Sequence, residues 1–304
     1  MTIGDGIRRD VATVGEEERG RLRDAFLLLD ATKYAYPDGV TYWDKQEETH
    51  KGAHVAGQDV HGGPAFLPWH RELCNRLERL LRLVDPQLSL HYWDWTTDPR
   101  VAGNGRAALF TTEFMGSSDG DIGVPYPDFE STEGSLHPKV WRHVAPGKPK
   151  AVDRLHAAMS LGVAPDDTIV TAGDDQPMDQ QYTAMDKVLQ GSHNYIHSRY
   201  IGGTIFNAHF SFHDPFVFLL HSNCDRLWAR WQNAPGHAWR LDPTQIYGFV
   251  GAPPASSVNA TLEPWATGGP DKVRPWFDNS DPADPPAAKT AKHPTIVAPP
   301  LYDR

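Results

Sequence analysis

The sequence predicts a mainly α-helical protein whose core is a bundle of four helices. In several segments apolar side chains recur at the spacing of one helix face. The sequence between these segments is rich in Gly, Pro, Asp and Ser, which favour loops. Histidines also recur inside or beside these helical segments, in a pattern that suits ligands projecting into a bundle core.

The N-terminal half holds two predicted helices. Residues 16–30, EEERGRLRDAFLLLD, place acids in the first turn and follow them with an apolar stripe that includes Phe26. Residues 68–84 carry leucines at helical spacing, with Pro68 suited to the first turn and Pro86 ending the helix. We expect each helix to bury one face.

The C-terminal half holds two more helices. Residues 178–200 run at helical period, and residues 214–233 open with Asp214 and Pro215, an N-cap followed by a proline in the first turn. Residues 96–176, between the halves, are expected to form loops with short helices at most and to shape a substrate entrance.

Composition and charge exclude several classes of protein. Apolar residues make up 39% and charged residues 22%, which suits a packed core. The net charge is −10 and no Lys/Arg block could follow a phosphate backbone, so nucleic acid is not an expected partner. With no apolar run of membrane-span length and no signal peptide, we expect a soluble protein, cytoplasmic or exported with a partner. Cys74 and Cys224 are expected to be free thiols, with a single disulfide as the alternative.

Three histidines of the C-terminal half point to a metal ion. His193 and His197 are four residues apart on a predicted helix, so their rings share a face and can bind one ion. His221 lies on the apolar side of the next helix, where an imidazole without a partner is costly to bury. Three imidazoles and no carboxylate suit copper or zinc rather than magnesium or calcium.

The N-terminal half offers a second set of histidines. His70 falls in the first turn of its helix, His61 stands nine residues earlier before a Gly-Gly turn, and a third ligand must come from His50 or His54. Two such sets suggest two ions in one four-helix core. The alternative is that these are unrelated helix histidines, each hydrogen-bonded to a partner of its own.

Longer motifs around these histidines resemble a known family. Residues 61–95, which contain HGGPAFLPWHR and end in HYWDW, resemble the first copper half of tyrosinases, catechol oxidases and molluscan-type hemocyanins. Residues 189–203 and 212–232 resemble the second half, with HNxxH, Gly-Gly, Asp-Pro and HxNxDRxW. The resemblance implies a type-3 dinuclear copper centre on a four-helix bundle.

The same resemblance implies one domain over residues 1–304. It divides into a copper A half at about 20–95, a loop region at about 96–176, a copper B half at about 177–233, and a tail at about 234–304. The Pro-rich composition of the tail predicts that it wraps the surface, with a partly disordered end as the alternative.

The implied ligands form one set of three histidines for each copper ion. They are His50, His61 and His70 for copper A, and His193, His197 and His221 for copper B. The segment YWDKQEETH, which ends at His50, resembles the helix end that precedes the first copper A ligand in the family, so His50 is favoured and His54 is the alternative. Asp94, Asn223 and Asp225 match family positions that are expected to fix imidazole orientation by hydrogen bonds.

Several positions depart from the family pattern. Asp59 stands where some relatives carry a cysteine bonded to a histidine, so no thioether is expected. Leu220 replaces the first histidine of a His-His doublet, and Val217 takes the place of an aromatic gate, which implies a more open mouth.

The most consequential departure is Gln190, three residues before His193. Many relatives have Glu there, thought to hold a water that takes the phenol proton, and an amide cannot accept that proton at neutral pH. Asp186, one turn back on the same face, is either a substitute carboxylate or an exposed helix acid. Asn194 matches a residue proposed to orient the base or water.

The implied function is that of a polyphenol oxidase. It would use two copper ions and dioxygen to convert o-diphenols (catechols) to o-quinones, with o-aminophenols as further substrates. Monophenol hydroxylation is expected to be weaker, because that step needs a base. A full tyrosinase (monophenol monooxygenase) and a hemocyanin-like dioxygen carrier are the alternatives. A zinc hydrolase is disfavoured because no HExxH motif is present. The natural phenol, the number of subunits and a helper protein that loads copper stay open.

Overall fold

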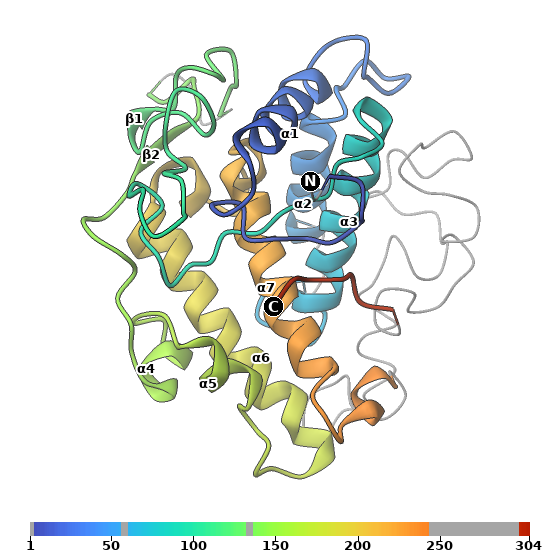
Figure 1. Ribbon diagram of the computed structural model, residues 1–304, viewed down its shortest axis with the longest axis vertical. Helices are drawn as coiled ribbons and strands as arrows, with labels where there is room; N and C mark the ends of the chain where they lie inside the picture. Colours follow the sequence, from blue (N-terminus) through green and yellow to red (C-terminus); the bar gives the residue numbers. More distant parts are fainter. Residues whose placement is uncertain (1–2, 56–59, 132–135, 243–297) are drawn as a thin grey trace.

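Five long helices dominate the part of the chain that the computed structural model describes, which is residues 3–55, 60–131, 136–242 and 298–304 (Figure 1). In chain order they are α1 Glu16–Leu29, α2 Asp44–Val55, α3 Phe66–Val84, α6 Met178–Tyr195 and α7 Phe216–Gln232. The four helices expected from periodicity are therefore confirmed. Helix α2 was not among the expected helices; the sequence indicated only that a helix ends near His50.

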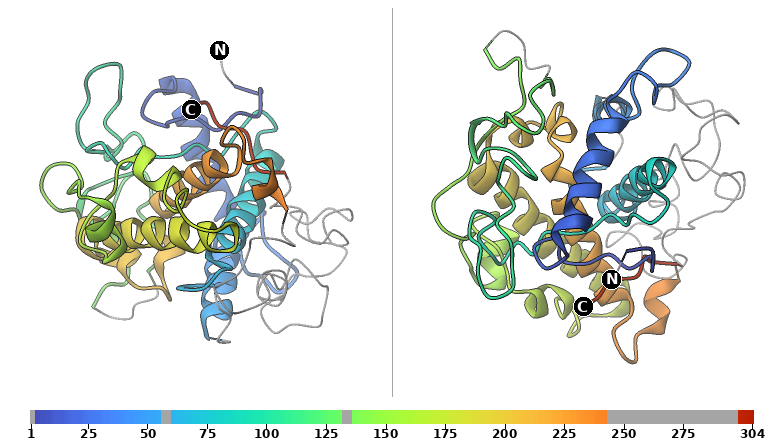
Figure 2. Two further views of the ribbon diagram at one scale, coloured as in Figure 1. Left: turned by 90° about the horizontal axis from the view of Figure 1, so that it is seen from below. Right: turned by 45° about the horizontal axis from the view of Figure 1, so that its top comes forward.

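Helices α2, α3, α6 and α7 carry the core, and α1 packs against α3. Helix α7 runs between α3 and α6 and contacts both (Figures 1 and 2). Leu73, Leu77 and Leu80 of α3 are fully buried, as their helical spacing predicts. Nearly every side chain of α7 is buried, because neighbours surround this helix. The expected mainly helical fold is confirmed.

Short elements fill the region between the two halves. They are β1 Asp119–Asp121, β2 Trp141–His143, α4 Arg154–Ala158 and α5 Asp166–Val170. Strands β1 and β2 pair antiparallel, with Asp119 opposite His143. The expectation of loops and short helices alone is wrong in this respect, because two extended segments satisfy their backbone groups by pairing with each other.

The end of α6 changes its helical period. The segment η1, Ile196–Ile201, is a π-helix that stops at Gly202, and the 3₁₀ turns η2 Gly203–Phe206 and η3 Ser211–His213 follow. Gly203 has φ 67°, and a Cβ there would lie 2.2 Å from the Trp141 carbonyl oxygen. Only glycine allows η2 to approach β2 this closely.

A buried ion pair fixes the start of α7. Arg142 of β2 donates two hydrogen bonds to Asp214, at 2.7 and 2.6 Å, and both side chains are fully buried. Asp214 Oδ1 also accepts a hydrogen bond from the backbone N–H of Phe216 at 2.9 Å. The Asp-Pro pair therefore both begins α7 and ties it to the small sheet.

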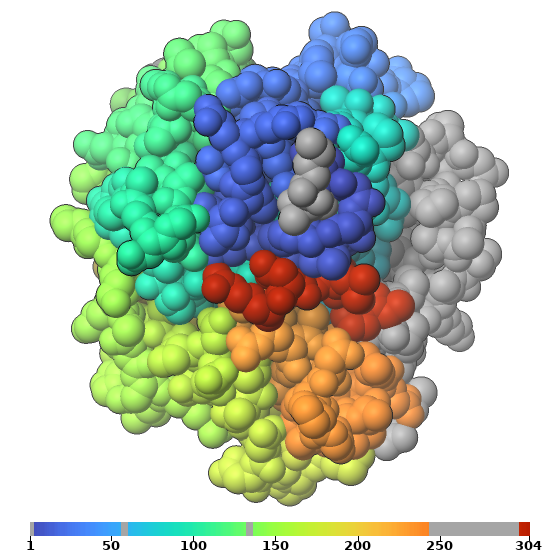
Figure 3. All heavy atoms as spheres, in the orientation of Figure 1, coloured from blue at the N-terminus to red at the C-terminus, as the bar shows by residue number. Residues whose placement is uncertain are grey.

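The last residues of the chain lie against its beginning. Figure 3 shows residues 298–304 crossing between the N-terminal segment and the helix α7 region. The Tyr302 hydroxyl donates to Asp225 at 2.6 Å and accepts from Arg8 at 3.0 Å. Of the Pro-rich tail, residues 243–297 lie outside the described residues, as does Asp59 with its expectation about a thioether.

Both cysteines behave as expected. Cys74 and Cys224 are buried free thiols, and burial raises the pKa of each. Among the described residues, none of the helices combines the length and apolar character needed to cross a bilayer.

Candidate metal centre

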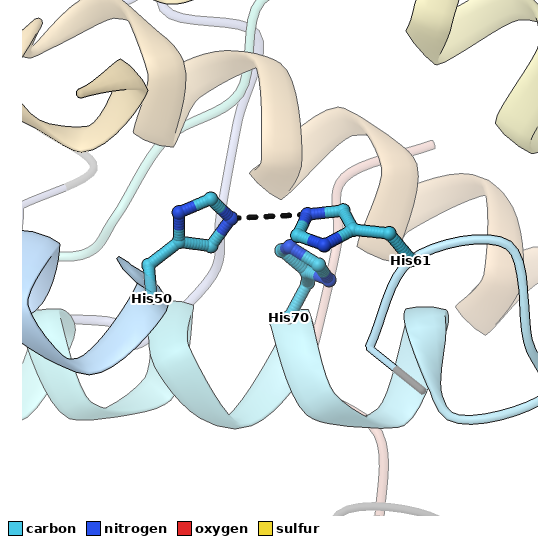
Figure 4. Close-up of side chains that lie close together, drawn as sticks. All are labelled: His50, His61 and His70. Carbon is cyan, nitrogen blue, oxygen red and sulfur yellow. Dashed lines mark hydrogen bonds between the residues drawn. The ribbon is translucent and has the colours of Figure 1, made fainter. Parts of the chain in front are cut away.

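The first cluster of imidazoles joins α2, α3 and the turn before α3. His50, His61 and His70 each bring one ring nitrogen to within 4.8 Å of the others. The Nε2 atoms of His50 and His61 are 3.0 Å apart, and Figure 4 shows the three rings converging on one point. His54 does not join this triad: its Nδ1 lies 3.4 Å from Nδ1 of His61, on the other side of that ring.

The second cluster joins α6, η1 and α7. His193, His197 and His221 also bring ring nitrogens to within 4.8 Å of one another, and Nε2 of His193 lies 3.2 Å from Nε2 of His221. His197 belongs to the π-helix η1, and π-segments are frequent at functional sites.

The two triads are neighbours in one core. The rings of His70 and His221, one from each triad, stack with centroids 4.5 Å apart and planes at 10°. Phe66 contacts both sets, with its ring 4.7 Å from that of His70 and 4.9 Å from that of His193. Histidines from both halves of the chain therefore surround one shared space.

Backbone carbonyls orient two of the rings. His70 Nδ1 lies 2.8 Å from the carbonyl oxygen of Phe66, and His197 Nδ1 lies 2.5 Å from that of Ile205. Each Nδ1 therefore carries the proton, and Nε2 keeps its lone pair. In both residues Nε2 is buried without a hydrogen-bond partner among the described residues, and a metal ion would satisfy it.

Burial keeps the imidazoles neutral. It lowers the pKa of His50 to about 3 and of His197 to about 4, and lowers that of His221 well below its usual value. A neutral imidazole is the form that binds a metal. Six neutral nitrogen ligands without a carboxylate suit copper.

The expected roles of three supporting residues are wrong. Asp225 binds Arg8, Arg71 and Tyr302, and Asn223 accepts a hydrogen bond from Arg226. Asp94 holds Thr96 and faces Arg106 and Arg304. Among the described residues, none of the three is hydrogen-bonded to an imidazole, because buried arginines bind the oxygen atoms of Asp225 and Asn223, and Thr96 and Arg304 bind those of Asp94. The carbonyls of Phe66 and Ile205 orient His70 and His197 instead, and of these two only Phe66, four residues before His70, was detectable from helical spacing.

A cavity of about 200 Å³ opens beside the two triads. Its wall includes five of the six histidines, all but His70, together with Asn194, Ser198, Phe206, Ala208 and Ser211. Phe206 is 62% exposed at this wall, whereas Val217, expected to mark the mouth, is fully buried and does not line the cavity. No described residue of 96–176 lines it either, so the expectation that this region shapes the entrance is wrong; loops after η1 do so instead.

The three expected catalytic residues lie in different surroundings. Gln190 accepts a hydrogen bond from the Gly62 N–H at 3.0 Å and donates to Asp186 at 2.5 Å, so it ties α6 to the turn that carries His61. Asp186 is buried, and neither it nor Gln190 lines the cavity. Asn194 does line it, with Oδ1 3.0 Å from Nδ1 of His193.

The family model for the common central domain of tyrosinase matches residues 40–234, which contain both triads. The chain belongs to the tyrosinase family. Family membership and the two histidine triads together make it a copper oxidoreductase domain with room for two ions. The family acts on phenolic compounds with dioxygen.

Individual relatives agree with this assignment. A tyrosinase of Streptomyces lincolnensis is 28% identical over 287 residues, covering 87% of this chain and 94% of that protein. A putative tyrosinase-like protein of Caenorhabditis elegans is 30% identical over 234 residues, which are 76% of this chain but only 32% of that longer protein.

A solved structure shares the fold. Deoxygenated hemocyanin from Rapana thomasiana superimposes with a TM-score of 0.57 at 21% identity, covering 98% of this chain and 69% of that one. At this level of identity the likeness concerns the fold alone.

Proposed function

We propose that the protein oxidises o-diphenols to o-quinones, and o-aminophenols by the same two-electron chemistry to o-quinone imines, and hydroxylates monophenols much more slowly. Its copper ligands would be His50, His61 and His70 for one ion and His193, His197 and His221 for the other. One observation carries the proposal: among the described residues, no carboxylate lines the cavity beside the triads.

The chemistry of the two substrate classes explains why this matters. Copper ions held by the two triads would supply the redox chemistry, in which a catechol loses two electrons and dioxygen accepts them. A monophenol must first lose its proton to a base, and general-base catalysis contributes roughly 10²- to 10⁴-fold. Gln190 is bound to Gly62 and to Asp186 and cannot accept a proton, so it supplies no base.

The cavity suits a single-ring phenol. Its volume of about 200 Å³ exceeds the ~150 Å³ that accommodates benzene in an engineered cavity. Ser211 is buried on its wall, and its Oγ has no hydrogen-bond partner among the described residues. This hydroxyl is placed to bond a substrate hydroxyl. Asn194 holds His193 by its ring Nδ1 and keeps the ring fixed during turnover.

The test compares a catechol with its matching monophenol on the copper-loaded protein. We expect initial rates on tyrosine to be at least about 100-fold below those on the corresponding catechol. Similar rates on both would reject the proposal in favour of a full tyrosinase. Reversible dioxygen binding without catechol consumption would reject it in favour of a carrier.

A variant pair tests the role of the missing carboxylate. Asn194→Asp keeps the side-chain shape and the contact to His193 but adds a carboxylate to the cavity wall, so the monophenol rate should rise relative to the catechol rate. Asn207→Asp is the matched control, since it makes the same change just after η2, at a residue that does not line the cavity. Equal ratios in the two variants would count against the cavity argument.

A further inference from the structure

Two buried polar atoms beside the first triad face each other. They are Nδ1 of His50 and Oε1 of Glu47, and neither has a hydrogen-bond partner among the described residues. The two atoms are 3.6 Å apart. Since an ordinary hydrogen bond of this kind ends at roughly 3.2 Å, a small movement of either side chain would form one. A buried donor and a buried acceptor are costly to leave unsatisfied, so the pair favours this movement.

Helix α2 and the turn η3 hold Glu47 in this place. Glu47 and His50 are three residues apart on α2, so their side chains share one face of the helix. The second carboxyl oxygen of Glu47 accepts a hydrogen bond from the backbone N–H of Phe212 in η3, at 2.5 Å. The ring of Phe212 packs against that of His50, with centroids 4.4 Å apart. The carboxyl group therefore ties α2 to η3 with one oxygen and presents the other to His50.

Other histidines of the two triads show what His50 requires. Nδ1 of His70 and of His197 is held by a backbone carbonyl, and Nδ1 of His193 by a side-chain amide oxygen. His50 directs Nε2 toward His61 at 3.0 Å, and Figure 4 shows its other ring nitrogen on the side away from His61. With Nε2 at a metal ion, a neutral imidazole carries its proton on Nδ1. The group that faces Nδ1 of His50 must therefore accept a hydrogen bond.

We propose that Glu47 is a positioning residue of the first copper site, whose Oε1 accepts a hydrogen bond from Nδ1–H of His50 and keeps Nε2 directed at the metal. Metal-binding imidazoles commonly donate their second N–H to a carboxylate, which fixes both the ring and the tautomer. Glu47 does not line the cavity beside the triads, so it acts through His50 and not on the substrate. The inference rests on the copper ligands of the proposed function and adds the group that orients one of them.

Glutamine cannot replace Glu47 in both of its contacts. A carboxyl group has two acceptor oxygens, whereas an amide has one oxygen and an NH₂ group that only donates. In Glu47→Gln the amide oxygen can accept from the Phe212 N–H or from His50, and the NH₂ group then faces the other donor. An NH₂ group opposite Nδ1 favours the tautomer with its proton on Nε2, where the metal must bind. The variant therefore keeps the size of the side chain and removes one acceptor.

The experiment loads the full chain with copper(I), which is diamagnetic, under anaerobic conditions after its histidines are labelled with nitrogen-15. The NMR signals of the ring nitrogens report each triad separately and show the state of the His50 Nδ1–H group. A copper(I) chelator then withdraws the metal, and the same signals give the affinity of each triad. Glu48→Gln is the matched control: it makes the same change on the next residue of α2, which is exposed and pairs with Lys45 at 2.7 Å.

We expect Glu47→Gln to bind copper at the first triad at least about 10-fold more weakly than the wild type, with the second triad unchanged. The Nδ1–H signal of His50, which the hydrogen bond to Glu47 moves downfield, should shift upfield. Glu48→Gln should match the wild type at both triads. Equal first-triad affinity in the two variants, or an unmoved Nδ1–H signal, would overturn the inference; the Ala208 carbonyl, another acceptor near the His50 ring, would then orient it. An equal loss at both triads would show a general disturbance of the core and would overturn it as well.

The wild type provides a second test that needs no variant. In a crystal structure of the copper-loaded chain, Glu47 Oε1 should lie within about 3.0 Å of His50 Nδ1, compared with the present 3.6 Å. A separation that stays at 3.6 Å would contradict the inference even if Glu47→Gln does not fold. If the wild type binds copper at both triads and the tests on Glu47 fail, the proposed oxidation of phenols stands. A first triad that binds no copper in the wild type would overturn both.

Discussion

Gly191 determines how closely α4 and α6 pack, and replacing it with alanine should disturb the centre. A Cβ at this position would lie 1.8 Å from the carbonyl oxygen of Ala157 and 2.8 Å from the Cα of Ala158. Restoring an ordinary 3.4 Å contact from 1.8 Å requires a movement of about 1.6 Å. The obstacle is backbone, so no side-chain rotation relieves it, and His193 lies only two residues further along α6.

The expected magnitude follows from two opposing effects. Overpacking of this kind costs about 1–3 kcal/mol, whereas Gly→Ala inside a helix contributes about 1 kcal/mol of stability. The difference leads us to expect that Gly191→Ala lowers the free energy of unfolding by up to about 2 kcal/mol and reduces the copper retained by the second triad. Urea unfolding of the copper-free chain, followed by tryptophan fluorescence, measures the first effect, and copper analysis the second.

Gly20→Ala in α1 is the matched control. A Cβ there would meet only Arg23 Nη2, at 3.8 Å, so this variant should be more stable than the wild type by up to about 1 kcal/mol. If Gly191→Ala is stabilised by as much as Gly20→Ala, the argument from close packing is refuted.

Three further predictions concern stability. Arg142→Met leaves Asp214 as an uncompensated buried charge and should cost about 3–5 kcal/mol in urea unfolding; a loss below 1 kcal/mol would mean that water replaces the arginine. Tyr302→Phe removes the hydroxyl bonded to Asp225 and should cost about 1 kcal/mol by the same assay, while an unchanged midpoint would disprove a role for this contact. The pKa of Asp30 is raised from 3.8 to about 6, so the folded state binds a proton more tightly than the unfolded state does. The stability that protonated Asp30 contributes is complete below pH 4 and is lost as the pH rises through 6. Asp30→Asn should therefore stabilise the chain at pH 7 but not at pH 4, by about 1 kcal/mol because the half-buried group is screened by solvent; an equal effect at both pH values would exclude this explanation.

The sequence by itself was sufficient for four of the five long helices and for most of the candidate ligands. Leucine spacing in α3 and the His193–His197 pair are local patterns, because a helix brings residues three or four apart onto one face. Asp214 and Pro215 likewise predicted where α7 begins.

Only the tertiary structure decided which of these residues meet. It placed His50 rather than His54 in the triad with His61, and it oriented His197 by the carbonyl of Ile205 rather than by an acidic or amide side chain. Asp225 instead pairs with Arg8 and Arg71, which are 217 and 154 residues away in the sequence, so arginines compete with imidazoles for its carboxylate. The spacing of residues along the chain does not predict the outcome of that competition. The physical reason is that the hydrogen-bond partners of a buried group are the groups that lie nearest to it once the helices have packed.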